Sequence, residues 1–205
     1  MRLALVSLVV PLAAAVATPP PVAAQVKVSP AVGLYMPVGN LVQGNLATGG
    51  EIRRQLPAGL IGVRIAAWPN HRFGLEGGIT FSPSQVAVTD SLRTVDVTSG
   101  VMLASARAFV ALGPQAARWS IHLGAGVGVV SRGGRAFDNT SGSSAPALAL
   151  SAGVRTRMRR TAVQMRFELE DYVLSARFNK GLPSETAARM HHDILWSLGV
   201  TVPVF

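Results

Sequence analysis

Apolar residues recur at every second position in eight stretches of this chain. In the stretch LIGVRIAAW, for example, Ile61, Val63 and Ile65 lie on one side of an extended chain, and Arg64 lies on the other. Alternation of this kind predicts half-buried β-strands rather than helices, whose period is 3.6 residues. The predicted strands span residues 26–38, 60–68, 73–81, 102–112, 119–130, 148–155, 163–169 and 194–204.

The charged residues of these stretches avoid the apolar side. In seven of the eight strands a charge could have fallen on an apolar position, and in none does it. One face of the predicted sheet is therefore intolerant of charge. The strands of a soluble β-sandwich alternate in the same way, so alternation alone does not distinguish a sandwich from a membrane barrel. The lengths of the connecting segments do.

The connectors alternate between short and long. Those at 69–72, at 113–118 and around Arg159 are tight, whereas the segments near 39–58, 83–98, 131–145 and 171–191 are long and rich in Gly, Ser, Asn and Asp. Short turns at the periplasmic end and long loops at the other are typical of transmembrane β-barrels. The pattern predicts an all-β, eight-stranded antiparallel up-and-down transmembrane barrel with short periplasmic turns and four longer extracellular loops.

The eight strands, the four long loops and the last strand, WSLGVTVPVF, resemble the small outer membrane β-barrel family of the OmpA and OmpX type. The resemblance is one of layout rather than of a signature motif, and it covers the whole mature chain. It implies insertion by the outer-membrane assembly machinery, with Trp196 and Phe205 as the assembly signal. Phe205 is out of phase with the outward residues of its strand. We expect a local slip at Pro203, which cannot donate a ladder hydrogen bond, to turn it outward.

An export signal precedes the predicted barrel. Arg2, an apolar core and the small-residue segment PPPVAAQ predict a signal peptide over residues 1–24 and a barrel domain over 25–205. The sequence has no cysteine, so disulfides, zinc sites with thiolate ligands and a lipoprotein anchor on cysteine are excluded. Beyond the signal there is no apolar run near 18 residues, so no transmembrane helix is expected. We therefore predict that the protein is located in the cell outer membrane.

The inward face carries charges of both signs. An eight-stranded barrel has room inside only for its own side chains, and charges buried there must be paired. We expect a salt-bridged plug rather than an open pore, built from Arg64, Glu76, Arg107, Arg155, Arg166, Glu168, Glu170 and Asp193. Counting across the tight turns places Arg64 opposite or diagonal to Glu76. The same count places Arg107 near Gly124, and Arg166 near Gly153.

Three groups of residues could carry chemistry. Ser120 and His122 are similar to the neighbouring Ser and His of outer-membrane lipid A deacylases, but both share the inward parity and suit an interior hydrogen-bond pair. His191, His192 and Asp193 suggest a metal site, yet adjacent strand residues point to opposite sides. The third group, Glu168 and Glu170, suits acid–base work, although pairing with interior arginines accounts for both carboxylates. We expect no enzymatic activity, no cofactor and no bound metal.

The net charge of +9 comes mainly from arginine. Arginine binds phosphate through two parallel hydrogen bonds, so basic loops suit outer membrane lipids, and lipopolysaccharide head groups in particular. The candidate residues are Arg53, Arg54, Arg132, Arg135, Arg177, Lys180 and Arg189. Nucleic acid is not an expected partner, because export separates the chain from it and no stacking aromatic residues accompany the arginines.

Three functions remain open on the sequence alone. The first is an integral outer membrane barrel with a structural or surface-interaction role and with its specificity in the extracellular loops. The second is a barrel enzyme that modifies lipids, and the third is a soluble periplasmic barrel of lipocalin type, with its apolar side chains inside. An outward Arg or Lys costs about 2–4 kcal/mol at mid-membrane, and the absence of such charges favours the first function.

Overall fold

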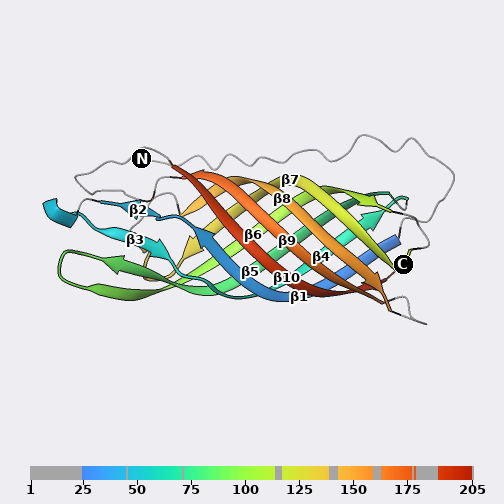
Figure 1. Cartoon of the computed structure of the whole chain (residues 1–205), viewed down its shortest axis with the longest axis horizontal. Helices are drawn as coiled ribbons and strands as arrows, with labels where there is room; N and C mark the ends of the chain where they lie inside the picture. The colour runs from blue at the N-terminus through green and yellow to red at the C-terminus, as the bar shows by residue number, and fades with distance from the viewer. Residues whose placement is uncertain are drawn as a thin grey trace, which may run out of the picture.

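The chain forms one antiparallel sheet that closes into a barrel (Figure 1). This computed structural model describes residues 25–44, 46–70, 72–113, 117–138, 143–158, 163–176, 178 and 189–204. The barrel strands are β1 (Gln25–Val38), β4 (Ala58–Trp68), β5 (Phe73–Thr89), β6 (Thr94–Leu112), β7 (Trp119–Gly133), β8 (Ser144–Arg157), β9 (Gln164–Ala176) and β10 (Arg189–Pro203). Each pairs with the next, so the predicted eight-stranded up-and-down fold is confirmed.

The first and last strands close the wall. β1 and β10 pair along nearly their whole length, from Lys27 opposite Pro203 to Val38 opposite His192. The register stays constant through Pro203, and the N–H of Val204 still donates to the carbonyl of Val26 at 2.8 Å. The slip expected at Pro203 is therefore wrong for the residues that are described, and Phe205 lies outside them.

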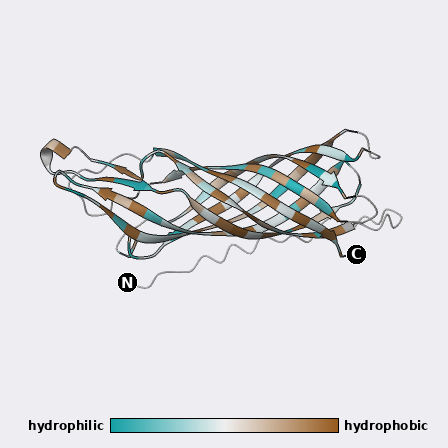
Figure 2. Cartoon of the chain, turned by 60° about the horizontal axis from the view of Figure 1, so that its bottom comes forward, coloured by the Kyte–Doolittle hydropathy of each residue, from teal (hydrophilic) through white to brown (hydrophobic). Residues whose placement is uncertain are grey.

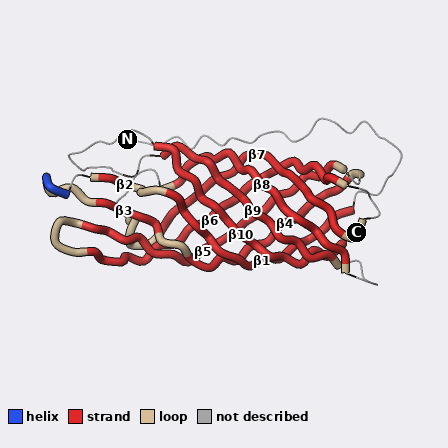
Figure 3. Tube along the Cα trace, in the orientation of Figure 1, coloured by secondary structure: helices blue, strands red, loops and turns tan. Residues whose placement is uncertain are grey.

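One predicted loop is a projecting piece of sheet. Residues 83–98 continue β5 and β6 beyond the barrel, and the side chain of Asp90 closes the hairpin by accepting hydrogen bonds from the N–H groups of Leu92 and Arg93, at 2.7 and 2.8 Å. Two short strands from the first long connector, β2 (Val42–Gln43) and β3 (Ile52–Gln55), extend this sheet next to β5, with the 3₁₀ turn η1 (Leu46–Thr48) between them. Figure 3 shows this hairpin ridge beyond the end of the barrel.

The outer surface of the wall is apolar. Residues at the outward positions are among the most exposed large hydrophobic side chains of the described chain, such as Val127 at 69 %, Leu75 at 64 % and Ile61 at 62 %. Figure 2 shows hydrophobic segments alternating with paler and hydrophilic ones along the strands. Outward charges on the described barrel strands lie only toward the long-loop end, where His192 and Asp171 pair at 2.9 Å. The lipocalin-like alternative requires the opposite arrangement, so the structure contradicts it.

The interior is layered along the barrel axis. Toward the long-loop end it is filled by apolar and aromatic side chains, including Tyr35, Leu103, Val130 and Leu195. Toward the short-turn end Trp68 and Phe109 form a smaller group. Charged side chains lie between the two. Within the described residues, the structure contains no helix with the length and hydropathy that a membrane crossing requires.

Candidate functional site

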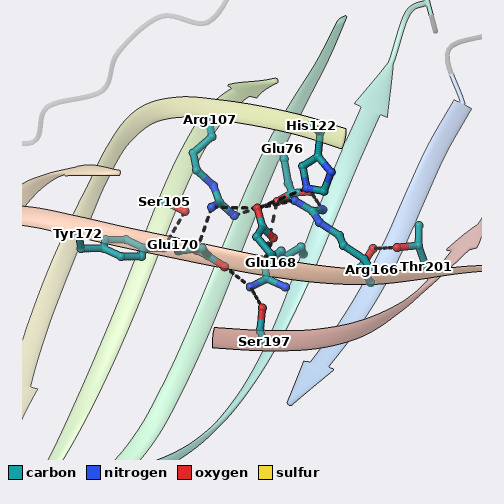
Figure 4. A network of polar contacts seen from close by, with 12 residues as sticks. Glu76, Ser105, Arg107, His122, Arg166, Glu168, Glu170, Tyr172, Ser197 and Thr201 are labelled. Atoms are coloured by element: carbon teal, nitrogen blue, oxygen red, sulfur yellow. Dashed lines mark hydrogen bonds and ion pairs between the residues drawn. The ribbon is translucent and has the colours of Figure 1, made fainter. Parts of the chain in front are cut away.

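The centre of the barrel holds six charged side chains from four strands, which we call the ion-pair layer (Figure 4). β4, β5 and β6 each contribute one residue, and β9 contributes three at alternate positions, which a strand turns to the same side. The members are Arg64, Glu76, Arg107, Arg166, Glu168 and Glu170. All six are buried, between 0 and 4 % exposed. Three positive and three negative charges make the layer neutral.

Within the ion-pair layer each arginine contacts at least two carboxylates. The Nη2 atom of Arg107 lies 2.9 Å from an oxygen of Glu76, and its Nη1 atom lies 2.9 Å from Glu170 and 3.4 Å from Glu168. Arg166 binds Glu168 at 2.8 Å and also pairs with Glu76. Arg64 pairs with Glu170 and lies 3.6 Å from Glu168. The contacts cross the lumen and tie the two sides of the wall together.

Neutral polar side chains extend the layer on both sides. The Ser197 hydroxyl accepts a hydrogen bond from Arg64 at 2.9 Å. The Tyr172 hydroxyl lies 3.2 Å from a Glu170 oxygen and 3.0 Å from the Ser105 hydroxyl. The Tyr172 hydroxyl can donate to a Glu170 oxygen, and the Ser197 hydroxyl accepts a guanidinium N–H of Arg64, so neutral groups satisfy polar atoms of both signs in the layer.

The predicted registers hold to within one diagonal step. Arg64 is diagonal to Glu76, as predicted. Arg107 lies opposite Gly126 and is diagonal to Gly124, and Arg166 lies opposite Arg155 and is diagonal to Gly153. The glycines make room for rings instead of guanidinium groups. A Cβ atom on Gly124 would lie 2.6 Å from the Phe109 ring, and one on Gly153 would lie 2.6 Å from the His122 ring.

A second ion pair lies toward the long-loop end. Asp193 pairs with Arg132 and accepts a hydrogen bond from the Tyr35 hydroxyl at 2.7 Å, so it does not join the ion-pair layer. Arg132 was predicted in an extracellular loop, and this is wrong. β7 continues to Gly133, which turns Arg132 inward, where it is 3 % exposed and stacks over Phe178 at 5.0 Å.

Arg155 was predicted to be salt-bridged, and the structure contradicts this as well. Within the described chain no carboxylate lies within 4 Å of its side chain, and its guanidinium instead stacks on Trp68 at 3.9 Å from the ring centroid. Lys27 approaches the same ring at 5.9 Å. Parity could have revealed this group, because Trp68 shares the inward side of its strand with Arg64.

The other candidate sites separate in space. His122 is fully buried and lies 3.8 Å from Glu168, and Ser120 also faces the lumen, so neither presents its side chain to lipid. His191 points inward, next to the Phe178 ring, whereas His192 points outward to Asp171. Among the residues that are described, no group of three or more His, Cys, Asp or Glu side chains is arranged to hold a metal ion.

Four other candidates for lipopolysaccharide binding lie at the long-loop end of the described chain: Arg53, Arg54, Arg135 and Arg189. Arg53 forms an ion pair with Glu51 at 2.6 Å, and Arg54 and Arg135 are exposed. Arg189 is exposed and donates a hydrogen bond to Gln43 at 2.8 Å, which links β10 to β2. The predicted residues Arg177 and Lys180 lie outside the described part of the chain.

Comparison with known proteins identifies the fold. No protein-family model and no curated protein sequence matches the chain. In structure it is similar to the outer membrane protein OprG from Pseudomonas aeruginosa, with a TM-score of 0.61 and 11 % identity over 88 % of this chain and 97 % of OprG. The outer membrane protein AlkL has a TM-score of 0.54 and 15 % identity over 89 % and 90 % of the two chains. For Neisserial surface protein A the TM-score is 0.53 and the identity 12 %, over 88 % and 97 %. The chain therefore has the fold of the small outer membrane β-barrel proteins.

Proposed function

We propose that this protein is an integral outer membrane barrel with a closed interior, which acts as a membrane-anchored scaffold for the segments at its long-loop end. The ion-pair layer carries this proposal. Its six buried side chains reach across the lumen from strands on different sides of the wall. Between this layer and the long-loop end, apolar side chains fill the lumen. An eight-stranded barrel leaves no aqueous channel once such side chains fill it.

Conductance measurements test the closed interior. Reconstituted into planar bilayers, the purified protein is expected to show no stable large-unit conductance. The charge-balanced double substitution Arg107→Ala with Glu170→Ala shortens two cross-lumen side chains that lie 2.9 Å apart, and is expected to raise ion permeability. The double substitution Arg53→Ala with Glu51→Ala, which removes a pair outside the barrel, is the matched control. Stable large channels in the unsubstituted protein contradict a closed lumen.

We further propose that the exposed arginines at the long-loop end bind anionic groups of lipopolysaccharide. Arg54, Arg135 and Arg189 supply this surface, since each is exposed and none has a carboxylate within 4 Å among the described residues. Guanidinium groups bind phosphate with charge-assisted, bidentate hydrogen bonds.

Lipid co-purification tests this surface. The triple substitution of Arg54, Arg135 and Arg189 to Gln is expected to reduce the lipopolysaccharide that co-purifies with the folded barrel several-fold. Substitution of Arg72, Arg118 and Arg157 to Gln removes the same number of exposed charges at the opposite end and is expected to have no such effect. Equal retention of lipopolysaccharide by the two triple variants contradicts the proposal.

A further inference from the structure

The barrel interior holds more cations than anions. Among the described residues, the buried lysine and arginine side chains number six and the buried carboxyl side chains four: Lys27, Arg64, Arg107, Arg132, Arg155 and Arg166 against Glu76, Glu168, Glu170 and Asp193. The ion-pair layer is balanced, and Arg132 has Asp193. The surplus therefore consists of Lys27 and Arg155, and both lie near the short-turn end of the barrel.

The two surplus cations converge on Trp68. The Arg155 guanidinium lies 3.9 Å from the centroid of the indole ring, and the Lys27 ammonium lies 5.9 Å from it. Trp68 reaches this position by lying against Gly74, where a Cβ atom would fall 2.6 Å from the ring. Lys27 comes from β1, which pairs with the strand of Trp68, and Arg155 comes from β8, which does not; the two basic side chains thus meet at one aromatic ring inside the lumen.

Arg155 is buried without a polar partner for part of its guanidinium group. It is 8 % exposed, and its Nε and Nη2 atoms are buried and make no hydrogen bond. The side chain opposite it in the ladder is Arg166, whose own guanidinium is occupied by Glu76 and Glu168. Stacking on an indole satisfies the face of a guanidinium group but not the N–H donors in its plane. Such donors, next to a second cation, favour an anionic acceptor.

We propose that Lys27 and Arg155, supported by Trp68, form a binding site for a phosphate-type oxyanion at the short-turn end of the lumen. The in-plane donors of Arg155 bind two oxygens of the anion, and the Lys27 ammonium binds a third and balances the second negative charge. Arg157, exposed two positions further along the same face of β8, adds positive potential at the entrance. The surplus of two charges matches hydrogen phosphate or a phosphate monoester. The site is independent of what the extracellular segments bind.

Phosphate titration tests the site directly. The protein has three tryptophans, so Trp119→Phe with Trp196→Phe leaves Trp68 as the only indole. In a phosphate-free maltoside detergent at constant ionic strength, inorganic phosphate is expected to change the Trp68 emission saturably and to raise the Tm, because a ligand that binds only the folded state stabilises it. Arg155→Gln and Lys27→Gln are each expected to weaken both responses at least tenfold. Arg54→Gln, which removes one exposed charge outside the barrel, is expected to leave them unchanged.

A further variant and a measurement in phospholipid nanodiscs complete the test. Arg155→Met removes the unpaired buried charge while keeping an apolar side chain over Trp68, so it is expected to fold and to lose the phosphate response. The proposal is overturned if Arg155→Gln and Arg155→Met respond to phosphate as strongly as Arg54→Gln does. It is also overturned if the response of the protein with Trp68 as its only indole never saturates. In phospholipid nanodiscs, a continued response to added phosphate supports a soluble oxyanion. An Arg155-dependent emission change on transfer into nanodiscs, with no further effect of phosphate, supports the same site with a lipid phosphate as its ligand.

Discussion

Glu168→Ala is expected to destabilise the folded barrel by about 3–5 kcal/mol, the cost of removing one partner from a buried ion pair. Glu168 is fully buried and lies within 4 Å of the guanidinium nitrogens of Arg64, Arg107 and Arg166. Its loss leaves three buried arginines with two carboxylates. Urea unfolding in lipid vesicles, followed by tryptophan emission, measures the change, and heat-modifiable mobility on gels reports the folded fraction.

Two controls separate this effect from a general loss of charge. Glu51→Ala removes a carboxylate from a partly exposed pair outside the barrel and is expected to cost about 0–1 kcal/mol. Arg166→Ala combined with Glu168→Ala restores charge balance, so the double variant is expected to lose less than the sum of the two single variants. A cost below about 1 kcal/mol for Glu168→Ala alone contradicts the role given to the ion-pair layer.

Val127→Arg is expected to cost about 2–4 kcal/mol of folded stability in a bilayer and to lower the yield of inserted barrel. Val127 is outward-facing, 69 % exposed, and lies near the middle of β7. An arginine at this position points into the hydrocarbon core of the bilayer, where neither water nor a carboxylate can compensate its charge. The same urea titration in vesicles measures the change.

Val95→Arg is the matched control, because it introduces the same residue at another exposed valine, on the hairpin ridge beyond the barrel. It is expected to change stability by no more than about 0.5 kcal/mol, as surface substitutions usually do. Equal effects of the two substitutions contradict a lipid-facing wall. A loss confined to Val127→Arg supports the orientation of the apolar face toward lipid.

Local periodicity was sufficient to predict the wall. Alternation assigns inward and outward positions residue by residue, since a strand turns successive side chains to opposite faces. It failed at the hairpin ridge, where Pro83, Ser84 and Ser99 are typical of loops. In the structure these residues belong to paired strands, and Gln55, from a distant segment, donates hydrogen bonds to the hydroxyls of Ser84 and Ser99 at 3.0 and 3.1 Å.

Parity predicted all six members of the ion-pair layer, but it also included Arg155 and Asp193, which lie elsewhere, and it did not predict which side chains pair. Pairing depends on register, and a shift of two residues keeps every side chain on its face while changing what it meets. That is why Arg155 was placed among carboxylates. In the structure it lies opposite Arg166 and stacks on Trp68, a contact between strands β8 and β4 that no local pattern contains.

The pairing of β1 with β10 has a consequence for how the chain acquires its structure. Hydrogen bonds between the first and last strands join residues from opposite ends of the domain, so the barrel has a high contact order and is expected to fold slowly. Until β10 arrives, β1 and β9 each expose an unpaired edge, which invites association with other chains. We therefore expect the polypeptide to be prone to association with other chains until its last strand pairs with its first.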